Sequence, residues 1–186
     1  MENETKETPQ RKHPRLDNYD YSSAGLYFIT ICSHNRKCIF SRIVERGLTG
    51  TPNDHRFASG NPYTPDLKIE YKEYGRIAEK QLLQLKNRYP TLKIYAYVIM
   101  PNHIHMIINP AYKAAGASPR PTIMDIICTF KSLTTRECKK LFPIDKVFQT
   151  SFYEHIIRNK EEYAEIMKYI HDNPAAWELD SLYSNN

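Results

Sequence analysis

Apolar and polar residues alternate along this chain with two periodicities, one typical of strands and the other typical of helices. Runs rich in β-forming residues predict strands at 25–33, 92–100 and 103–108 and within 147–159. Apolar residues at helical spacing predict helices at 72–89, at 123–141 and from about 160 to 173. Stretches rich in Gly, Pro and Asn, such as 48–66, are typical of the loops between such elements.

Residues that favour the start and the end of a helix stand at the limits of two of these segments. Thr122 can cap the second helix, with Asp125 three residues later. Asn159 and Glu162 have the spacing of a capping box at the start of the third helix, and Pro174 follows its predicted end. The helix boundaries therefore have a local chemical basis besides the apolar periodicity.

The order of the elements predicts the fold class. It reads strand, helix, strand, strand, helix, strand, followed by an extra C-terminal helix. This is the βαββαβ order of an α+β, ferredoxin-like antiparallel sheet with helices on one face, so we expect the other face to be open to a ligand. Two further apolar runs, at 37–47 and 67–71, predict a hairpin across the 48–66 loop.

The chain length suits one domain, because 186 residues can bury a core of ordinary size. We expect a polar N-terminal arm at 1–20, a single domain at 21–177 and a C-terminal tail at 178–186. No apolar run approaches the ~18 residues of a membrane span. We therefore expect no membrane partner. The four cysteines form no CxxC pair, so we expect a reduced, cytoplasmic protein.

The charge is compatible with a nucleic-acid partner. The formal net charge is +5, and the fourteen tyrosines include side chains that can stack on bases. Many soluble proteins are equally basic, however, and tyrosine is also common in protein cores. Composition alone therefore leaves the function open.

The stretch MPNHIHMII, residues 100–108, carries two histidines in an otherwise apolar run. Side chains alternate along a strand, so His103 and His105 are expected to point to the same side. Histidines in this arrangement can bind one metal ion together. They can also be a hydrogen-bonded pair on a half-exposed sheet, because a buried imidazole needs polar partners. The residues alone leave both interpretations open.

The predicted C-terminal helix has an apolar stripe beside a polar face. The stripe consists of Tyr163, Ile166, Met167 and Ile170. Tyr169 lies where the two faces meet, and Asn173 neighbours it one turn later. A residue in such a position is usually an amphipathic anchor with a buried ring and a solvated hydroxyl. Periodicity alone favours that structural role for Tyr169.

These motifs together resemble one family. MPNHIHMII, followed further along the chain by YEHIIRNKEEYAEIMKYIHDNPAAW, is similar to the single-tyrosine HUH transposases, and specifically to their REP-associated tyrosine transposase branch. RLDNYDYSSAGLYFITICSHNRKCIF and EYGRIAE also resemble that branch, so the likeness covers most of residues 14–177 in order. An isolated H-x-H pattern is common, whereas H-x-H on a strand with a downstream Y-I-x-x-N-P helix is specific.

The resemblance implies a chemistry. Members of the family cut single-stranded DNA with a tyrosine, so Tyr169 is implied as the nucleophile that forms a 5′-phosphotyrosine link. His103 and His105 are implied as ligands of a divalent cation, expected to be Mg²⁺ or Mn²⁺, with Asn173 as the third ligand. Histidine suits Mg²⁺ poorly, so the ligand set alone would favour Mn²⁺ or Zn²⁺. Pro174 also disfavours helical geometry at Asn173.

The implied partner is single-stranded or hairpin DNA, such as repetitive extragenic palindromes or the ends of a mobile element. His155, Arg158 and Lys131 are candidate phosphate contacts, although each also has an ordinary interpretation as a strand histidine or a surface cation. Relatives either keep the site within one chain or swap the tyrosine helix between subunits. Both a monomer and a homodimer therefore stay open.

Two other functions remain as alternatives. A tyrosine-rich sheet with one open face also resembles RNA-recognition architecture, which implies a non-catalytic module for single-stranded nucleic acid that needs no metal. A metal-dependent hydrolase that uses water would need carboxylate ligands or a base near the histidines, and the strand itself supplies none. The combination of His103, His105 and Tyr169 favours the transposase-like enzyme.

Overall fold

A computed structural model describes residues 25–45, 67–110 and 121–184 of the chain. Within these residues, four strands form one antiparallel sheet in the order β4-β5-β1-β6. The strands are β1 (Leu26–Cys32), β4 (Lys93–Ile99), β5 (His103–Asn109) and β6 (Tyr153–Ile157). This element order and pairing confirm the predicted α+β fold with a ferredoxin-like sheet.

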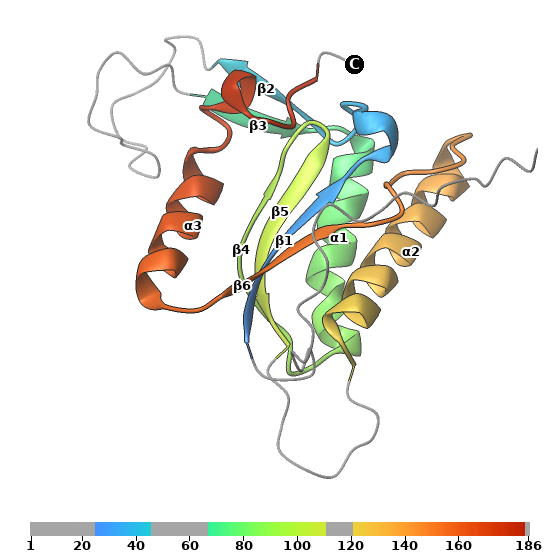
Figure 1. The fold of residues 1–186 in the computed structure, drawn as a ribbon. Coiled ribbons are helices and arrows are strands. Elements are labelled where there is room, and N and C mark those ends of the chain that lie inside the picture. The colour runs from blue at the N-terminus through green and yellow to red at the C-terminus, as the bar shows by residue number, and fades with distance from the viewer. Residues whose placement is uncertain (1–24, 46–66, 111–120, 185–186) are drawn as a thin grey trace, which may run out of the picture.

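Two helices cover one face of the sheet and a third lies on the opposite side (Figure 1). They are α1 (Glu73–Arg88), α2 (Ile123–Leu141) and α3 (Lys160–Asp172). The predicted apolar stripe of α3 packs with Val98 of β4 and Ile107 of β5. The face that the sequence predicted to be open is therefore partly covered, because α3 needs an apolar surface for its stripe.

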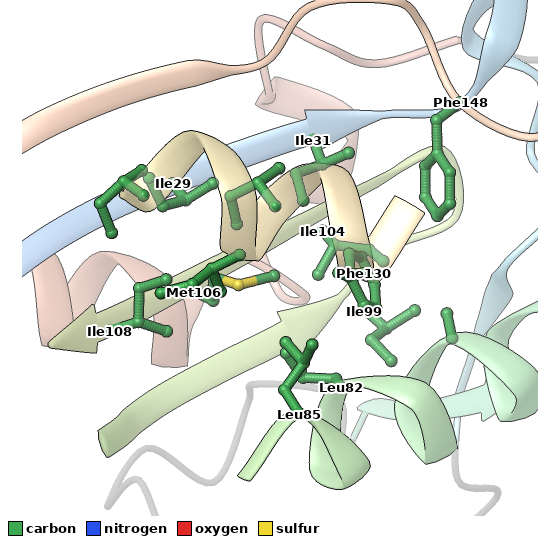
Figure 2. Packing of buried hydrophobic residues seen from close by; sticks show 14 of the residues in the cluster. Ile29, Ile31, Leu82, Leu85, Ile99, Ile104, Met106, Ile108, Phe130 and Phe148 are labelled. Atoms are coloured by element: carbon green, nitrogen blue, oxygen red, sulfur yellow. The ribbon is translucent and has the colours of Figure 1, made fainter. Parts of the chain in front are cut away.

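The main core lies between the sheet and the pair α1 and α2, and it follows from side-chain alternation. Figure 2 shows β1 and β5 contributing alternate residues that meet side chains from both helices. The labelled residues of β1 and β5 are Ile29, Ile31, Ile104, Met106 and Ile108, and the helix residues include Leu82, Leu85 and Phe130. Since successive side chains of β5 point to opposite faces, His103 and His105 lie on the side of α3.

The predicted hairpin is also present. Strands β2 (Ser41–Glu45) and β3 (Leu67–Tyr71) form a separate two-stranded antiparallel sheet near the end of the main sheet where β5 begins (Figure 1). Ile43 and Ile69 extend the apolar cluster beneath α3. Two short 3-10 helices of the described residues, η1 (His34–Arg36) and η3 (Trp177–Leu179), also lie at this end.

The helix caps agree with the sequence in all but one contact. Thr122 and Asp125 form the complete capping box of α2. At α3, Asn159 Oδ1 accepts the predicted hydrogen bond from the backbone N–H of Glu162, at 2.8 Å. The Glu162 carboxylate accepts from the backbone N–H of Arg158 instead of closing the box onto Asn159. Asn159 therefore caps the helix as predicted, but the Glu162 carboxylate binds the backbone N–H of Arg158, one residue before Asn159.

Some expectations fall outside the described residues. The polar arm at 1–20, the 48–66 loop and most of the 110–120 loop lie there. Among the helices that the structure does describe, none has the length and apolar character needed to cross a membrane.

Candidate active site

Two buried imidazoles form the floor of the site. His103 and His105 are 0% and 2% exposed, and their ring centroids lie 4.4 Å apart. Their strand, β5, is hydrogen-bonded to β1 on one side and β4 on the other. Side-chain alternation on this strand brings the two rings together, as the H-x-H spacing predicted, and the ladder on both sides holds their backbone in place.

Hydrogen bonds at the Nδ1 atoms orient both rings. Asn102 Nδ2 donates to the backbone carbonyls of Arg36 and Leu182, so its Oδ1 is the acceptor that faces His103 Nδ1 at 2.8 Å. His105 Nδ1 lies 2.8 Å from the hydroxyl of Thr30. A proton on each Nδ1 satisfies these contacts and leaves the Nε2 lone pairs for another partner.

Tyr169 contacts His105 of this pair. Its hydroxyl oxygen is 3.3 Å from His105 Nε2, and its ring lies edge-on to His105 with centroids 5.2 Å apart. Phe28 stacks on the ring of His105 and contacts the Tyr169 ring edge-on. Tyr169 is nevertheless 43% exposed, so its hydroxyl joins a buried polar cluster to the solvent. The half-buried position agrees with the boundary predicted from periodicity.

Asn173 follows one helical turn after Tyr169. Its backbone N–H donates to the Tyr169 carbonyl at 2.9 Å, and its φ and ψ of −54° and −40° are helical. The restriction expected from Pro174 therefore does not move Asn173 off the helix. Its side chain is buried, and Oδ1 has no hydrogen-bond partner among the described residues. Tyr169 and Asn173 thus both reach the cluster around the histidines.

Asp180 is the residue that sequence reasoning missed. Its side chain is 1% exposed, and Oδ2 lies 3.8 Å from His103 Nε2 and 3.5 Å from the Tyr169 hydroxyl. Asn173 Nδ2 donates to the same oxygen at 2.8 Å. The ligand atoms of His103, His105 and Asp180 lie within 4.8 Å of one another, so these three residues could hold a metal ion.

Nothing in the sequence marks Asp180. It follows Pro174 and η3, outside any periodic element, and it lies in the segment that the sequence assigned to a C-terminal tail. In the structure this segment contacts the site, because Leu182 accepts a hydrogen bond from Asn102 and donates its backbone N–H to Asp180 Oδ1.

Burial sets the protonation of these groups. It lowers the pKa of His103 to about 4 and that of His105 to about 2, from an ordinary value of 6.5, and the Asp180 carboxylate partly opposes the shift at His103. Both imidazoles are therefore neutral at pH 7. Burial and the charge of Asp180 raise the pKa of Tyr169 above its ordinary value of 10, so the phenol keeps its proton there.

The three candidate phosphate contacts lie outside this cluster and differ in their surroundings. Lys131 donates to the backbone carbonyls of Gln149, Thr150 and Ser151. His155 Nε2 pairs with Glu162 at 2.6 Å. Arg158 is exposed at the turn before α3. Their role in binding DNA stays a prediction.

Residues 76–173, more than half of the chain, match the family model for IS200-like transposases. An uncharacterised protein of Haemophilus influenzae is 31% identical over 188 residues, and the match covers 93% of each chain.

Similar solved structures include a REP-associated tyrosine transposase bound to a REP hairpin, with a TM-score of 0.54, 18% identity and coverage of 90% of this chain and 73% of that one. A putative transposase from Deinococcus radiodurans R1 matches with a TM-score of 0.45, 14% identity and coverage of 86% and 97%. The first of these shows a shared fold. The family match over more than half of the chain shows that the protein belongs to the IS200-like transposase family.

Proposed function

We propose that this transposase cuts and rejoins single-stranded DNA through a 5′-phosphotyrosine at Tyr169, with the help of a divalent cation. The observation that carries the proposal is the 3.3 Å separation between the Tyr169 hydroxyl and His105 Nε2. A hydroxyl nucleophile therefore lies beside two neutral imidazoles whose Nε2 lone pairs suit a metal. The exposed side of Tyr169 leaves room for a DNA strand to approach.

In the proposed reaction, the Tyr169 oxygen forms a bond to a backbone phosphorus, and the bond from that phosphorus to the 3′-oxygen breaks. The phenol loses its proton to an acceptor, and the leaving oxygen gains one to become a 3′-hydroxyl. The phosphotyrosine link keeps the energy of the broken bond. A second 3′-hydroxyl can therefore reverse the step and join two strands without ATP.

His103, His105 and Asn173 are the proposed holders of the cation, and two buried atoms support the fit. His103 Nε2 and Asn173 Oδ1 have no hydrogen-bond partner among the described residues, whereas buried polar atoms are normally paired. Metal binding also needs neutral imidazoles, which burial provides. A bound Mg²⁺ or Mn²⁺ would neutralise charge on the scissile phosphate.

Hairpin or palindromic single-stranded DNA is the proposed substrate. A protein of the same fold is bound to a REP hairpin, and the net charge of +5 favours a polyanionic partner. We therefore propose membership of the REP-associated branch. Arg158 is free to approach a phosphate, whereas a contact by Lys131 would replace one of its hydrogen bonds to carbonyl oxygens. The site side chains come from one chain, so a monomer is sufficient to assemble them.

The decisive experiment uses a hairpin oligonucleotide carrying a label at its 3′ end, the full chain and Mn²⁺. Because the phosphotyrosine forms on the 5′ end of the downstream fragment, the 3′ label should move to the protein band on a denaturing gel. A 5′ label should instead appear on a free, shorter strand. Tyr169→Phe should abolish both signals while DNA binding persists, because binding needs no hydroxyl at that point.

Tyr163→Phe is the matched control. Tyr163 lies on the same helix, but it packs in the apolar cluster and contacts the ring of Tyr95. It should form the adduct normally and lose at most about 1 kcal/mol of stability. An adduct mapped by mass spectrometry to a tyrosine other than Tyr169 would disprove the proposed nucleophile.

The alternatives predict different outcomes of the same experiment. A metal-dependent hydrolase would cut the DNA without an adduct, and its activity would survive Tyr169→Phe. The Asp180 carboxylate beside the histidines supplies the carboxylate ligand that such a hydrolase needs. A binding module would retain the hairpin and leave it uncut. For the metal, His103→Ala and His105→Ala should each abolish cleavage without loss of the fold, and normal cleavage by either would refute the ligand assignment.

A further inference from the structure

We propose that Asp180 is a ligand of the divalent cation and supplies the negative charge that the other proposed ligands lack. The inference rests on the proposed function, because it concerns the same metal site. It adds a ligand from η3 and the turn after it, beyond the strand and the helix on which the other ligands lie.

The first support is the burial of the carboxylate. The Asp180 side chain is 1% exposed, and its only ion-pair partner among the residues that the structure describes is His103. His103 is itself fully buried, and the amide of Asn173 that donates to Asp180 is uncharged. A buried carboxylate is strongly unfavourable unless a cation is nearby. A divalent ion between Asp180 and the imidazoles would supply that compensation.

The second support is the convergence of the ligand atoms. Asp180 Oδ2 and one nitrogen from each of His103 and His105 lie within 4.8 Å of one another. Each of the three groups is held from behind, since Asn102 and Thr30 bind the Nδ1 atoms and the Leu182 N–H binds Asp180 Oδ1. Such outer contacts aim the free lone pairs inward, as in protein metal sites.

Asn173 acts on the same carboxylate. Its Nδ2 donates to Asp180 Oδ2 at 2.8 Å, while its own Oδ1 is buried without a partner within the described part of the chain. One amide therefore fixes the position of the carboxylate and holds an unpaired oxygen in the same cluster. Asn173 and Asp180 can thus add two oxygen ligands to the two imidazoles.

The added carboxylate changes which metals the site suits. Two imidazoles and an amide carry no net charge and match Mg²⁺ poorly, because that ion prefers oxygen ligands. With Asp180 the ligand set gains one negative charge and a hard oxygen. Two histidines and one carboxylate are a common set for divalent first-row ions, so the site should favour Mn²⁺ more strongly than the histidine pair does alone.

The chain offers a direct optical readout of binding. Trp177 is its single tryptophan, and the centroid of its ring lies 5.9 Å from that of His103. Paramagnetic Mn²⁺ bound beside His103 should quench the fluorescence of this ring. Titration of the EDTA-treated, dialysed full chain with MnCl₂ then gives a dissociation constant without DNA and without turnover, and calorimetry can verify it.

The test compares four proteins. Asp180→Asn keeps the size of the side chain and removes its charge, and we expect at least a tenfold weaker affinity for Mn²⁺. Asp172→Asn is the matched control, because Asp172 is an exposed carboxylate at the end of α3, paired with His171, and it should bind like the wild type. Asp180→Glu restores a carboxylate and should recover part of the affinity. The loss in Asp180→Asn should be smaller for Zn²⁺, which histidine suits better.

The outcomes separate this inference from the proposed function. Equal Mn²⁺ affinity in the wild type and Asp180→Asn would overturn the role of Asp180 and leave the other ligands intact. A wild type that binds no Mn²⁺ would overturn the proposed metal dependence itself. If Asp180→Asn does not fold, as judged by circular dichroism in EDTA, Asp180→Glu decides the question, and affinity no better than that of His103→Ala would refute the inference.

Discussion

The hydroxyl of Thr30 on β1 lies 2.8 Å from Nδ1 of His105 on β5, and these two residues are direct partners in the antiparallel register. The contact crosses the sheet on the face that carries the site. A proton on Nδ1 of His105 satisfies this contact and keeps Nε2 available to Tyr169 or a metal.

Thr30→Val should therefore weaken the site without changing its ligands. The buried Nδ1–H of His105 would lose its acceptor, which should cost about 1–3 kcal/mol of stability. Loss of such an outer contact typically lowers metal affinity about 10–100-fold. Urea unfolding in EDTA and the Mn²⁺ titration measure the two effects. Thr30→Ser keeps the hydroxyl and should retain both properties, so a similar loss in the serine variant would contradict the explanation.

The stability of the metal-free protein should fall in mild acid. His103 and His105 have folded-state pKa values far below 6.5, so below about pH 6.5 the unfolded chain binds protons that the folded chain does not. Stability is therefore fully present above that pH and decreases as the pH falls toward 4. At pH 5 the loss should be about 2 kcal/mol per histidine.

Chemical unfolding at pH 7 and pH 5, both in EDTA, measures this difference. His105→Gln should remove about half of it, because glutamine does not titrate in this range. A wild-type stability that is unchanged between the two pH values would show that the imidazoles are not held in their neutral form.

Binding to single-stranded DNA should weaken as salt rises, and Arg36 should contribute to the slope. Arg36 is exposed on η1, and its backbone carbonyl accepts a hydrogen bond from Asn102, which holds His103. Arg36→Ala should reduce the slope of log K against log salt by about one. Arg88→Ala, at the end of α1 on the other face, should not change it. A flat salt response of the wild type would argue against a nucleic-acid partner.

Gly75 should tolerate no side chain. A Cβ at this position in α1 would lie 2.1 Å from the backbone carbonyl oxygen of Phe40, which also accepts from the backbone N–H of Lys72. Gly75→Ala should therefore destabilise the protein by about 2 kcal/mol, despite the better helix propensity of alanine. Gln84→Ala, exposed on the same helix, should change stability by less than about 0.5 kcal/mol. Thermal unfolding of both variants provides the comparison.

Local rules were sufficient for most of the fold. The helix bounds and the caps Thr122 and Asn159 follow from apolar spacing and side-chain chemistry at the helix starts. The pairing of His103 with His105 follows from alternation on one strand. The covered second face was not predicted, because periodicity identifies an apolar stripe without naming the surface on which it packs.

The candidate site could be predicted only in part from such local rules. Tyr169 and Asn173 share one helix, so their relation is a matter of spacing, but their approach to His105 depends on how that helix packs on the sheet. Asp180 is marked neither by helical spacing nor by alternation along a strand. Its position is set by tertiary contacts with Asn173 and Leu182, and an isolated aspartate after a helix is otherwise ordinary.

The strand that carries the two histidines and the helix that carries Tyr169 differ in how they can open. β5 is hydrogen-bonded on both edges and almost wholly buried, whereas α3 has one buried residue, Ile170. Amide hydrogens of β5 should therefore exchange with solvent only when the whole domain unfolds, and those in the last turn of α3 should exchange through local fraying. The two histidines of the candidate site therefore lie on a strand that opens only when the whole domain unfolds. Tyr169 lies on a helix whose last turn can unfold and refold locally.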